Sequence, residues 1–358
     1  MPYPGRHASA SPLQSRAGTL EVKPTLAPIL NSIQILQNPS LGRRPHAWRH
    51  GNAWGPRPLG KIQIALLVVI LSLFLSGCSK VGLAYNSADY FIKSYVQDYL
   101  DLEPVQIDGW QPLLDTELGR HRAEELPYLA SFIDQLLTVN RVGFDDDNME
   151  CILRSFRVLY KRQARFAVKL TTPLLATLTP TQIEALEKRF NQEDAEDLDK
   201  AKQYFSAAKL EKRHRRLVKS LEDWTGPLQA NQKAMVVDFL SNMPDIEPSR
   251  IHYRQHKRAK LIDLLRVKAG QQALGTYLTD WIVDFSDAPP DLNQGMTRIN
   301  KLISALFIQL GTSLDESQRA RLDDRLKNLR DDLMKLQEKP QMATISCQKT
   351  PLKVAEPG

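Results

Sequence analysis

Two histidines four residues apart, His252 and His256, are the first side chains that could do chemistry, because a helix would place both rings on one face. Pairs of this spacing bind zinc in proteases, where a glutamate directly after the first histidine acts as the general base. Tyr253 occupies that place here, and the surrounding arginines and lysines oppose the binding of a dication. The pair therefore does not predict a metal site, and we expect no cofactor.

An acidic segment, Asp145-Asp146-Asp147-Asn148, could bind a hard cation. It lacks the glycine at the sixth position and the glutamate at the twelfth that an EF-hand loop needs. Acidic side chains also favour the first turn of a helix, so we predict that the segment caps one. The sequence has no nucleophile elbow, phosphate-binding loop or histidine–carboxylate grouping, and we therefore expect a protein that is not an enzyme.

The thiol of Cys78 follows an apolar run over residues 62–75, which Lys61 precedes. This arrangement is typical of a secretory signal, and the run is short for a membrane span, which needs about 20 apolar residues. The residues directly before the thiol are Leu75, Ser76 and Gly77. Leu-Ser-Gly-Cys resembles the bacterial lipobox, in which the thiol is acylated with diacylglycerol and the chain is cut just before it. We expect a signal peptide at 61–77 and lipid attachment at Cys78; the alternative is a membrane-anchor helix in which the cysteine takes this place by chance.

The residues around the motif indicate where the mature chain is held. Ser79, and not aspartate, follows Cys78, which by resemblance to bacterial lipoprotein sorting favours the periplasmic leaflet of the outer membrane. Residues 1–60 hold nine of the 22 prolines and show no sustained periodicity. We interpret them as a disordered extension or as the result of a start codon placed too far upstream.

The formal charge of +7 comes from the first 77 residues, which contain eight basic residues and one acid. Positions 78–358 then hold 40 basic and 40 acidic residues, so the mature chain is neutral. A nucleic-acid partner is therefore not expected.

The pattern from Tyr85 to Gln337 is helical, with hydrophobic residues at every third or fourth position and charged residues between them. One example is Leu322, Leu326, Leu329 and Leu333. No segment alternates with period two, so we predict an all-α fold, an elongated bundle of antiparallel amphipathic helices. This domain is placed at 78–338, with a soft division near residue 143 or 226.

The last segment, residues 339–358, is polar and contains prolines, and we expect a disordered tail. It carries Cys347, which could reach back to Cys151 on a helix. The periplasm would permit a disulfide between them. Because the two residues show no spacing that is typical of a bridge, both a disulfide and two free thiols remain open.

Four segments share the pattern Leu-x-x-x-Gln and mark expected helix starts. They are Leu102–Gln106, Leu178–Gln182, Leu228–Gln232 and Leu314–Gln318. In the second, Thr179 can accept a hydrogen bond from the backbone of Gln182 while the glutamine side chain reaches back, which is a capping box. The third segment lacks a strong cap. We interpret the four as repeated helix starts, compatible with an old duplication.

Two basic stripes could bind an anionic partner such as a lipid headgroup or a cell-wall polymer. The first is Lys212–Arg216 with Lys209 and Lys219, and we expect the acids of 193–199 to compensate it across a helical hairpin. The second has fewer local acids and is the surface that we expect to meet an anionic partner. It consists of Arg250, Arg254, Lys257, Arg258 and Lys260.

Aromatic residues gather close to the expected anchor. They are Tyr85, Tyr90, Phe91, Tyr95 and Tyr99. Amphipathic rings near an acylated terminus can lie at a membrane interface. The alternative, which we favour, is a first helix that packs on the bundle.

Residues 78–106 are similar to a family of uncharacterised proteobacterial lipoproteins. The likeness lies in Tyr85-Asn86, in Asp89-Tyr90 and in Asp98-Tyr99-Leu100-Asp101-Leu102, followed by Gln106. The resemblance implies a helical fold and a lipid anchor, and it brings no established activity. Leu178-Thr179-Pro180-Thr181-Gln182 resembles the LTxxQ motif of the much shorter Spy-type periplasmic chaperones.

These observations favour a non-enzymatic lipoprotein of the outer membrane that serves as an interaction or envelope-maintenance module. Its expected partners are the membrane, through the lipid, and an envelope protein. A chaperone that binds unfolded periplasmic proteins is the first alternative, and an enzyme with an unrecognised site is the second.

Overall fold

The computed structural model of the protein describes residues 80–345, and every regular element in this part of the chain is a helix. The elements are α3 (Lys80–Asn86), α4 (Ala88–Leu100), α5 (Pro104–Glu124), α6 (Leu126–Val142), α7 (Asp146–Leu175), α8 (Pro180–Lys202), α9 (Ala207–Thr225), α10 (Ala230–Ser241), α11 (Glu247–Arg266), α12 (Gln271–Leu278), the π-helix η1 (Thr279–Asp284), α13 (Pro290–Ser313) and α14 (Glu316–Lys335). The prediction of an all-α fold is confirmed.

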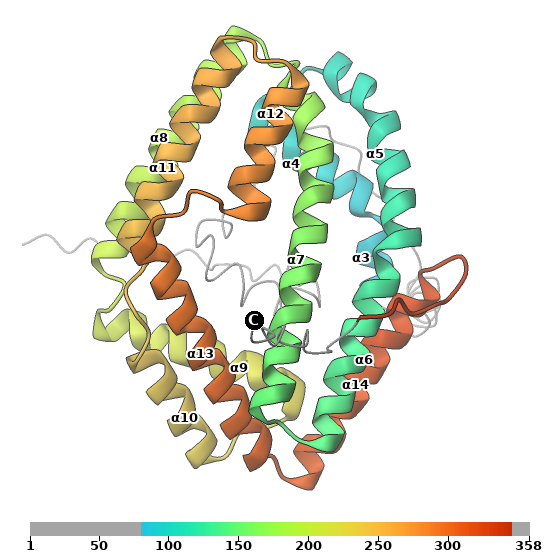
Figure 1. Cartoon of the computed structure of the whole chain (residues 1–358), viewed down its shortest axis with the longest axis vertical. Helices are drawn as coiled ribbons and strands as arrows, with labels where there is room; N and C mark the ends of the chain where they lie inside the picture. The colour runs from blue at the N-terminus through green and yellow to red at the C-terminus, as the bar shows by residue number, and fades with distance from the viewer. Residues whose placement is uncertain (1–79, 346–358) are drawn as a thin grey trace, which may run out of the picture.

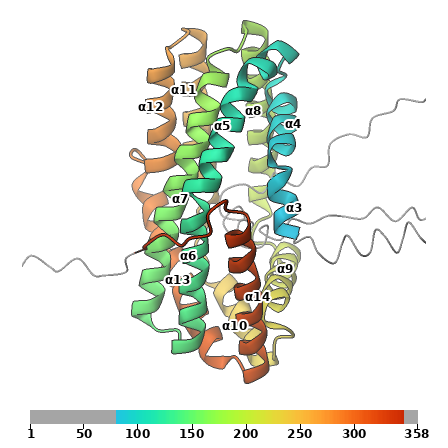
Figure 2. The same ribbon diagram turned by 90° about the vertical axis from the view of Figure 1, so that its right-hand side faces the viewer.

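The helices form an elongated bundle in which most axes follow the long direction of the molecule (Figure 1). The closest pairs are α6 with α14 and α8 with α11. Turned by 90°, the molecule shows α12, α11 and α13 along one side and α4, α3 and α9 along the other (Figure 2). Helix α7 is 30 residues long and runs along most of the length of the molecule (Figure 1).

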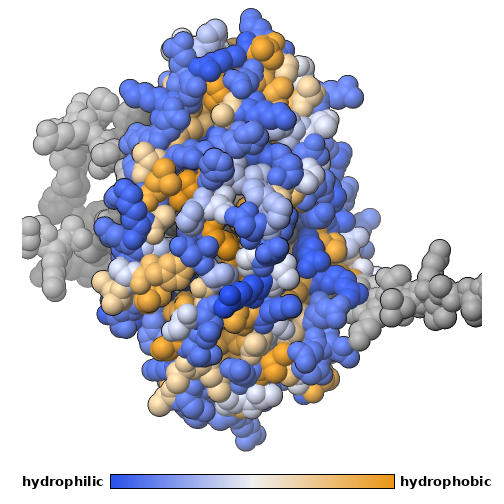
Figure 3. Space-filling view, turned by 60° about the vertical axis from the view of Figure 1, so that its left-hand side comes forward, coloured by the Kyte–Doolittle hydropathy of each residue, from blue (hydrophilic) through white to orange (hydrophobic). Residues whose placement is uncertain are grey.

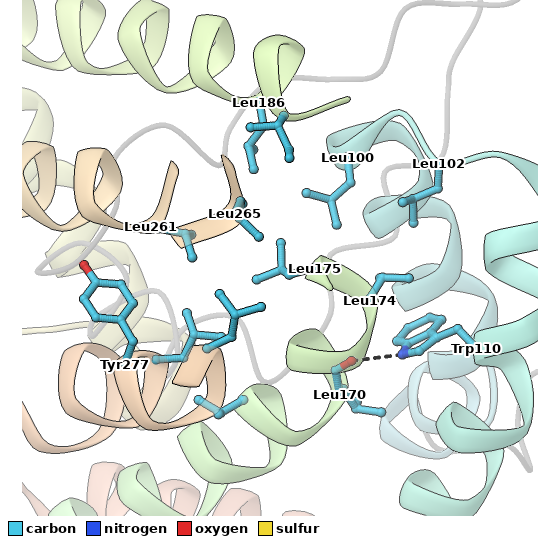
Figure 4. Close-up of a cluster of buried hydrophobic side chains, with 14 of the residues drawn as sticks. Leu100, Leu102, Trp110, Leu170, Leu174, Leu175, Leu186, Leu261, Leu265 and Tyr277 are labelled. Carbon is cyan, nitrogen blue, oxygen red and sulfur yellow. Dashed lines mark hydrogen bonds between the residues drawn. The ribbon is translucent and has the colours of Figure 1, made fainter. Parts of the chain in front are cut away.

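Two large groups of buried side chains hold the bundle together, and α7 contributes to both. The first group joins α4, α5, α8, α11 and α12 to the C-terminal half of α7 (Figure 4). In it the indole nitrogen of Trp110 donates to the carbonyl oxygen of Leu170 over 2.9 Å. The second group joins α3, α6 and α14 to the N-terminal half of α7. Each fully buried leucine stabilises the fold by about 1.5–3 kcal/mol.

The expected helix starts are observed. They could be predicted because each cap is formed by residues close together in the sequence. Helices α5, α8, α10 and α14 each begin with a capping box. The third segment also has one, made by the side chain of Gln229. At the start of α7 the Asp145 carboxylate accepts the backbone N–H of Asn148 over 2.7 Å, so the prediction that this acidic segment caps a helix is confirmed.

The expected boundary at residue 338 is corrected, because the chain beyond it is bound to α6. The backbone N–H of Ala343 donates to the carbonyl oxygen of Pro127 over 3.2 Å, and the Ser131 hydroxyl donates to the carbonyl oxygen of Ala343 over 2.5 Å. The Gln135 amide donates to the carbonyl oxygen of Ile345 over 3.3 Å. The first part of the predicted tail therefore belongs to the fold.

Several predictions fall on parts of the chain that the structure does not describe. The segments 1–60 and 61–77, with Leu75, Ser76 and Gly77, lie outside the described residues, as does Cys78. Within residues 80–345 no helix combines the length and the apolar character needed to span a membrane.

Candidate functional site

Charged side chains from α8 and α11 meet in a cluster at the interface of the two helices. Arg254 lies 2.8 Å from Asp194 and 2.9 Å from Asp197. Arg258 lies 2.6 Å from Asp194 and 2.6 Å from Glu193. The two arginines are four residues apart on α11, so they lie on one face of that helix. They reach acids that share one face of α8.

The remaining members of the expected anionic-partner surface are also engaged. Arg250 is buried and pairs with Glu247 over 2.6 Å. Lys257 is 2% exposed, and its ammonium lies 2.5 Å from the carboxylate of Asp287. Lys260 alone among the five is exposed, with its nitrogen 5.5 Å from the ring centre of Tyr277.

The prediction that this stripe meets an anionic partner is therefore wrong for four of its five residues, Arg250, Arg254, Lys257 and Arg258. The physical reason is that their side of α11 packs on α8 and on the turn that holds Asp287. Buried charges persist only when they are paired, and each of these cations has a carboxylate partner. The cluster is a structural element of the bundle.

The electrostatics of the cluster favour the ionised acids. Burial raises the pKa of Asp197, but the hydrogen bonds from Lys200 and Arg254 outweigh it and hold the pKa below its usual value. Burial likewise raises the pKa of Asp287, and the bonds from Lys257 and Tyr253 outweigh it and lower the pKa. Both carboxylates therefore stay charged at neutral pH.

This pairing changes the interpretation of the first basic stripe. The acids of 193–199 were expected to compensate it, but Glu193, Asp194 and Asp197 bind α11 and Lys200 instead. That expectation is wrong because the two stripes compete for the same acids and α11 lies against them. The cations of α9 are left without this compensation.

A row of four cations follows the outer side of α9, at spacings of three, four and three residues. The members of this basic row are Lys209, Lys212, Arg216 and Lys219, and all four are exposed. No carboxylate of the described residues forms an ion pair with them, whereas the neighbouring Arg215 lies 3.3 Å from Glu211. The opposite side of α9 packs Val218 and Leu221 into a buried group with α10 and α13.

The aromatic residues near the N-terminal end of the described chain divide between two environments. On α4, Ile92, Val96 and Tyr99 pack against the first buried group, as the interpretation of a packed helix predicts. Tyr90 and Phe91 are 63% and 60% exposed on the other side, with their ring centres 5.6 Å apart. The helix therefore packs on the bundle and also presents an aromatic surface.

The glutamines of the four Leu-x-x-x-Gln segments bind one another in two pairs. The side-chain amide of Gln106 donates to Gln182 over 3.1 Å, and Gln182 donates to Gln106 over 2.7 Å. Gln232 and Gln318 do the same over 2.9 and 3.0 Å. The pattern predicts four helix starts, and the pairing was not predicted from it.

Each glutamine also binds the backbone before its partner's helix. Gln106 donates to the carbonyl oxygen of Thr177, and Gln182 donates to that of Asp101, over 2.9 and 2.7 Å. In the second pair, Gln232 donates to Ser313 over 3.0 Å and Gln318 donates to Pro227 over 2.7 Å. Each of these glutamines thus caps its own helix and binds it to another helix.

A family model described as "Family of unknown function (DUF6279)" matches residues 98–284, more than half of the chain. The chain belongs to this family. No curated protein and no solved structure matches it.

The match includes most of the features described above. The first three Leu-x-x-x-Gln segments, the charge cluster of α8 and α11, and the basic row of α9 lie inside it, whereas α14 and Gln318 lie beyond its end. The resemblance to an uncharacterised family is confirmed through DUF6279. The lipoprotein part of that resemblance stays a prediction.

Two open depressions lie on the described part of this DUF6279 protein, one on α13 between Asn293 and Lys301 and one beside the end of α14. Hydrophilic side chains cover most of the face shown in Figure 3, with hydrophobic ones in separate groups. No three potential metal ligands gather within residues 80–345, and His252 and His256 are both exposed.

Of the two states left open for Cys151, the structure shows the disulfide. Cys151 on α7 is disulfide-bonded. Both other cysteines of this DUF6279 protein, Cys78 and Cys347, lie outside the described residues.

Proposed function

We propose that this DUF6279 protein is a lipid-anchored, non-enzymatic interaction module of the bacterial envelope. The observation that carries the proposal is the Leu75–Cys78 motif directly after an apolar run that Lys61 precedes. The helical fold begins at Lys80, two residues after the expected acylated cysteine. A chain cut before Cys78 would therefore carry its lipid two residues before its first described helix.

Serine after the cysteine supports the periplasmic leaflet of the outer membrane as the location. The mature chain is neutral, and most of its buried charges serve contacts between its own helices. The neutral charge and the internal use of the buried charges both agree with a protein that binds an envelope protein through the outer surface of its bundle.

The anchor is tested by metabolic labelling with an alkyne fatty acid, followed by detection of the label on the purified protein. We expect label on the wild type and none on Cys78→Ala. Cys347→Ala is the matched control, because it removes one thiol and leaves the motif intact, and it should label like the wild type. Equal labelling of wild type and Cys78→Ala would refute the anchor.

A chaperone for unfolded periplasmic proteins is the second candidate, and the exposed rings of Tyr90 and Phe91 are the observation that favours it. The LTxxQ likeness adds less, because Gln182 is buried and bound to Gln106. An interaction module should crosslink to one defined envelope protein and leave the aggregation of a model client unchanged. Suppression of aggregation at near-stoichiometric ratio, lost in Tyr90→Ser/Phe91→Ser, would establish the chaperone instead.

A further inference from the structure

The basic row lies on a helix that runs across the long axis of the molecule (Figure 1). Exposed residues of α9 include the four cations of the row and Arg215, against two acids, Glu211 and Asp223. Because Glu211 is already paired with Arg215, the row keeps its positive charge. A helix that packs with one side and presents cations on the other can adsorb to an anionic surface lying parallel to its axis.

The exposed aromatic surface lies on the same side of the molecule as α9. Figure 2 shows α4, α3 and α9 along one side, with α11 and α13 along the opposite side. Leu83 on α3 and Tyr90 and Phe91 on α4 are each more than half exposed. Aromatic rings of this kind favour the headgroup region of a bilayer, where the apolar ring and a polar edge are both accommodated.

The chain also enters the fold on this side. Val81 of α3 and Trp224 of α9 belong to the same buried group, and both helices contact α14. Cys78 precedes Lys80 by two residues, and each residue spans at most about 3.6 Å. A lipidated Cys78 would therefore lie within about 7 Å of the start of α3, and its lipid would hold the bilayer close to this helix.

We propose that the side formed by α3, α4 and α9 docks on the anionic phospholipid surface that holds the lipid of Cys78; this inference rests on the anchor proposed above. The basic row binds phospholipid phosphates, and Leu83, Tyr90 and Phe91 enter the headgroup region. The opposite side, with α11 and α13, then faces away from the membrane and is free to meet a partner. The anchor supplies proximity, and the row and the rings fix the orientation.

The docking is tested by the reactivity of individual lysines towards an amine-reactive reagent, read by mass spectrometry. The natively lipidated protein is reconstituted in vesicles of phosphatidylethanolamine with phosphatidylglycerol and compared with the same protein in nonionic detergent. We expect Lys212 and Lys219 to react at least about threefold more slowly on the vesicles, since each cation near an anionic leaflet strengthens adsorption about fivefold. Lys260 and Lys301, exposed on the opposite side, should react equally in both.

A charge variant and its matched control separate docking from general adsorption. In Lys212→Gln/Arg216→Gln/Lys219→Gln we expect the remaining Lys209 to regain the reactivity it has in detergent. The control removes three exposed cations from the other side, Lys260→Gln/Arg298→Gln/Lys301→Gln, and should keep Lys209 protected. Circular dichroism of both variants in detergent checks that the helices are intact.

The outcomes for the anchor and for the docking differ. Protein that leaves the vesicles in high salt contradicts the lipid anchor. Protein that stays on the vesicles with Lys212 and Lys219 fully reactive contradicts the docking and leaves the anchor standing. Protection of Lys212 and Lys219 by a soluble polyanion, with none on the vesicles, would show that the row serves an anionic polymer instead and would also overturn the proposal.

Discussion

Gln232 shows how much one side chain does in this protein. It is fully buried, it accepts and donates hydrogen bonds with Gln318, and it donates to the backbone of Ser313. A buried polar group that loses its partner costs about 1–3 kcal/mol, more than the gain from forming one such bond. The glutamine pairs therefore make the junction of α10 and α14 specific as well as stable.

We expect Gln232→Leu to lower the free energy of unfolding by about 1–3 kcal/mol, because the buried amide of Gln318 loses its partner on α10 and the carbonyl oxygen of Ser313 loses its donor. Urea denaturation followed by circular dichroism measures it. Gln294→Leu, at an exposed position of α13, is the control and should change little. In Gln232→Leu/Gln318→Leu the cost should be smaller than the sum of the two single changes; additive costs would contradict a direct coupling of the two side chains.

The charge cluster gives a pH dependence with a defined sign. The pKa of Asp197 is lower in the folded protein than its usual value, so the unfolded chain binds more protons over that interval. The contribution of Asp197 to stability is thus present above about pH 4 and is lost as the pH falls through the lower, folded pKa. Stability should decrease steeply on acidification below about pH 4.

The pH dependence is measured by urea denaturation at a series of acidic pH values. In Asp197→Asn we expect a shallower fall of stability with decreasing pH than in the wild type. Asp199→Asn removes an exposed carboxylate from the same helix and should preserve the wild-type slope. An unchanged slope in Asp197→Asn would show that other acids cause the acid sensitivity.

At the scale of the elements, close approach of α13 to the loop before α7 depends on a residue without a side chain. Gly311 is buried on α13, and a Cβ atom there would overlap the ring of Phe144. We expect Gly311→Ala to destabilise the fold by about 1–3 kcal/mol through overpacking. Thermal unfolding of the purified variant measures the loss.

Gly109 on α5 is the matched control for this change. It is an exposed helical glycine with no atom close enough to meet an added Cβ. Gly109→Ala should stabilise the protein by up to about 1 kcal/mol, because alanine favours the helix. If both alanine variants were stabilised, the close approach at Phe144 would not limit the packing.

The contacts of the chain at Ala343 and Ile345 with α6 bring it beside the helix hairpin that contains Cys151. If Cys78 carries lipid, as proposed above, it has no free thiol, and Cys347 would be the partner of the disulfide-bonded Cys151. We therefore expect a peptide that joins Cys151 to Cys347 in a digest of the unreduced protein. Cys347→Ser should lower stability by about 2–4 kcal/mol.

Reduction is the control for the bridge. Reduced wild-type protein and Cys347→Ser should unfold at the same denaturant concentration. A peptide that joins Cys151 to Cys78 would contradict the bridge to Cys347, and it would contradict the lipid anchor with it.

The sequence predicts the secondary structure well because its signals are local. The caps of Thr179 and Asp145, with the hydrophobic periodicity, decide where helices begin and which side they bury. The charge cluster could not be predicted in this way. Arg254 and Asp197 are far apart in the sequence, and their meeting depends on the packing of α11 on α8.

For the whole molecule, the packing of α11 on α8 decides which basic surface remains exposed without paired acids. Two basic stripes of similar composition were present, and the acids of 193–199 could pair with either. Packing assigned the acids to α11 and left the basic row of α9 exposed, the reverse of what the sequence indicated. The prediction of a binding surface from charge alone therefore failed here, because two basic helices compete for one set of acids.

The two glutamine pairs also impose an order on the folding of the chain during its synthesis or export. A chain that leaves the ribosome or a translocon N-terminus first can form the junction between Gln106 and Gln182 before its last third has emerged. The junction between Gln232 and Gln318 must wait for the start of α14, when nearly the entire chain has emerged. The end of the polypeptide thus completes the architecture, and a chain truncated before α14 would lack its second fastening.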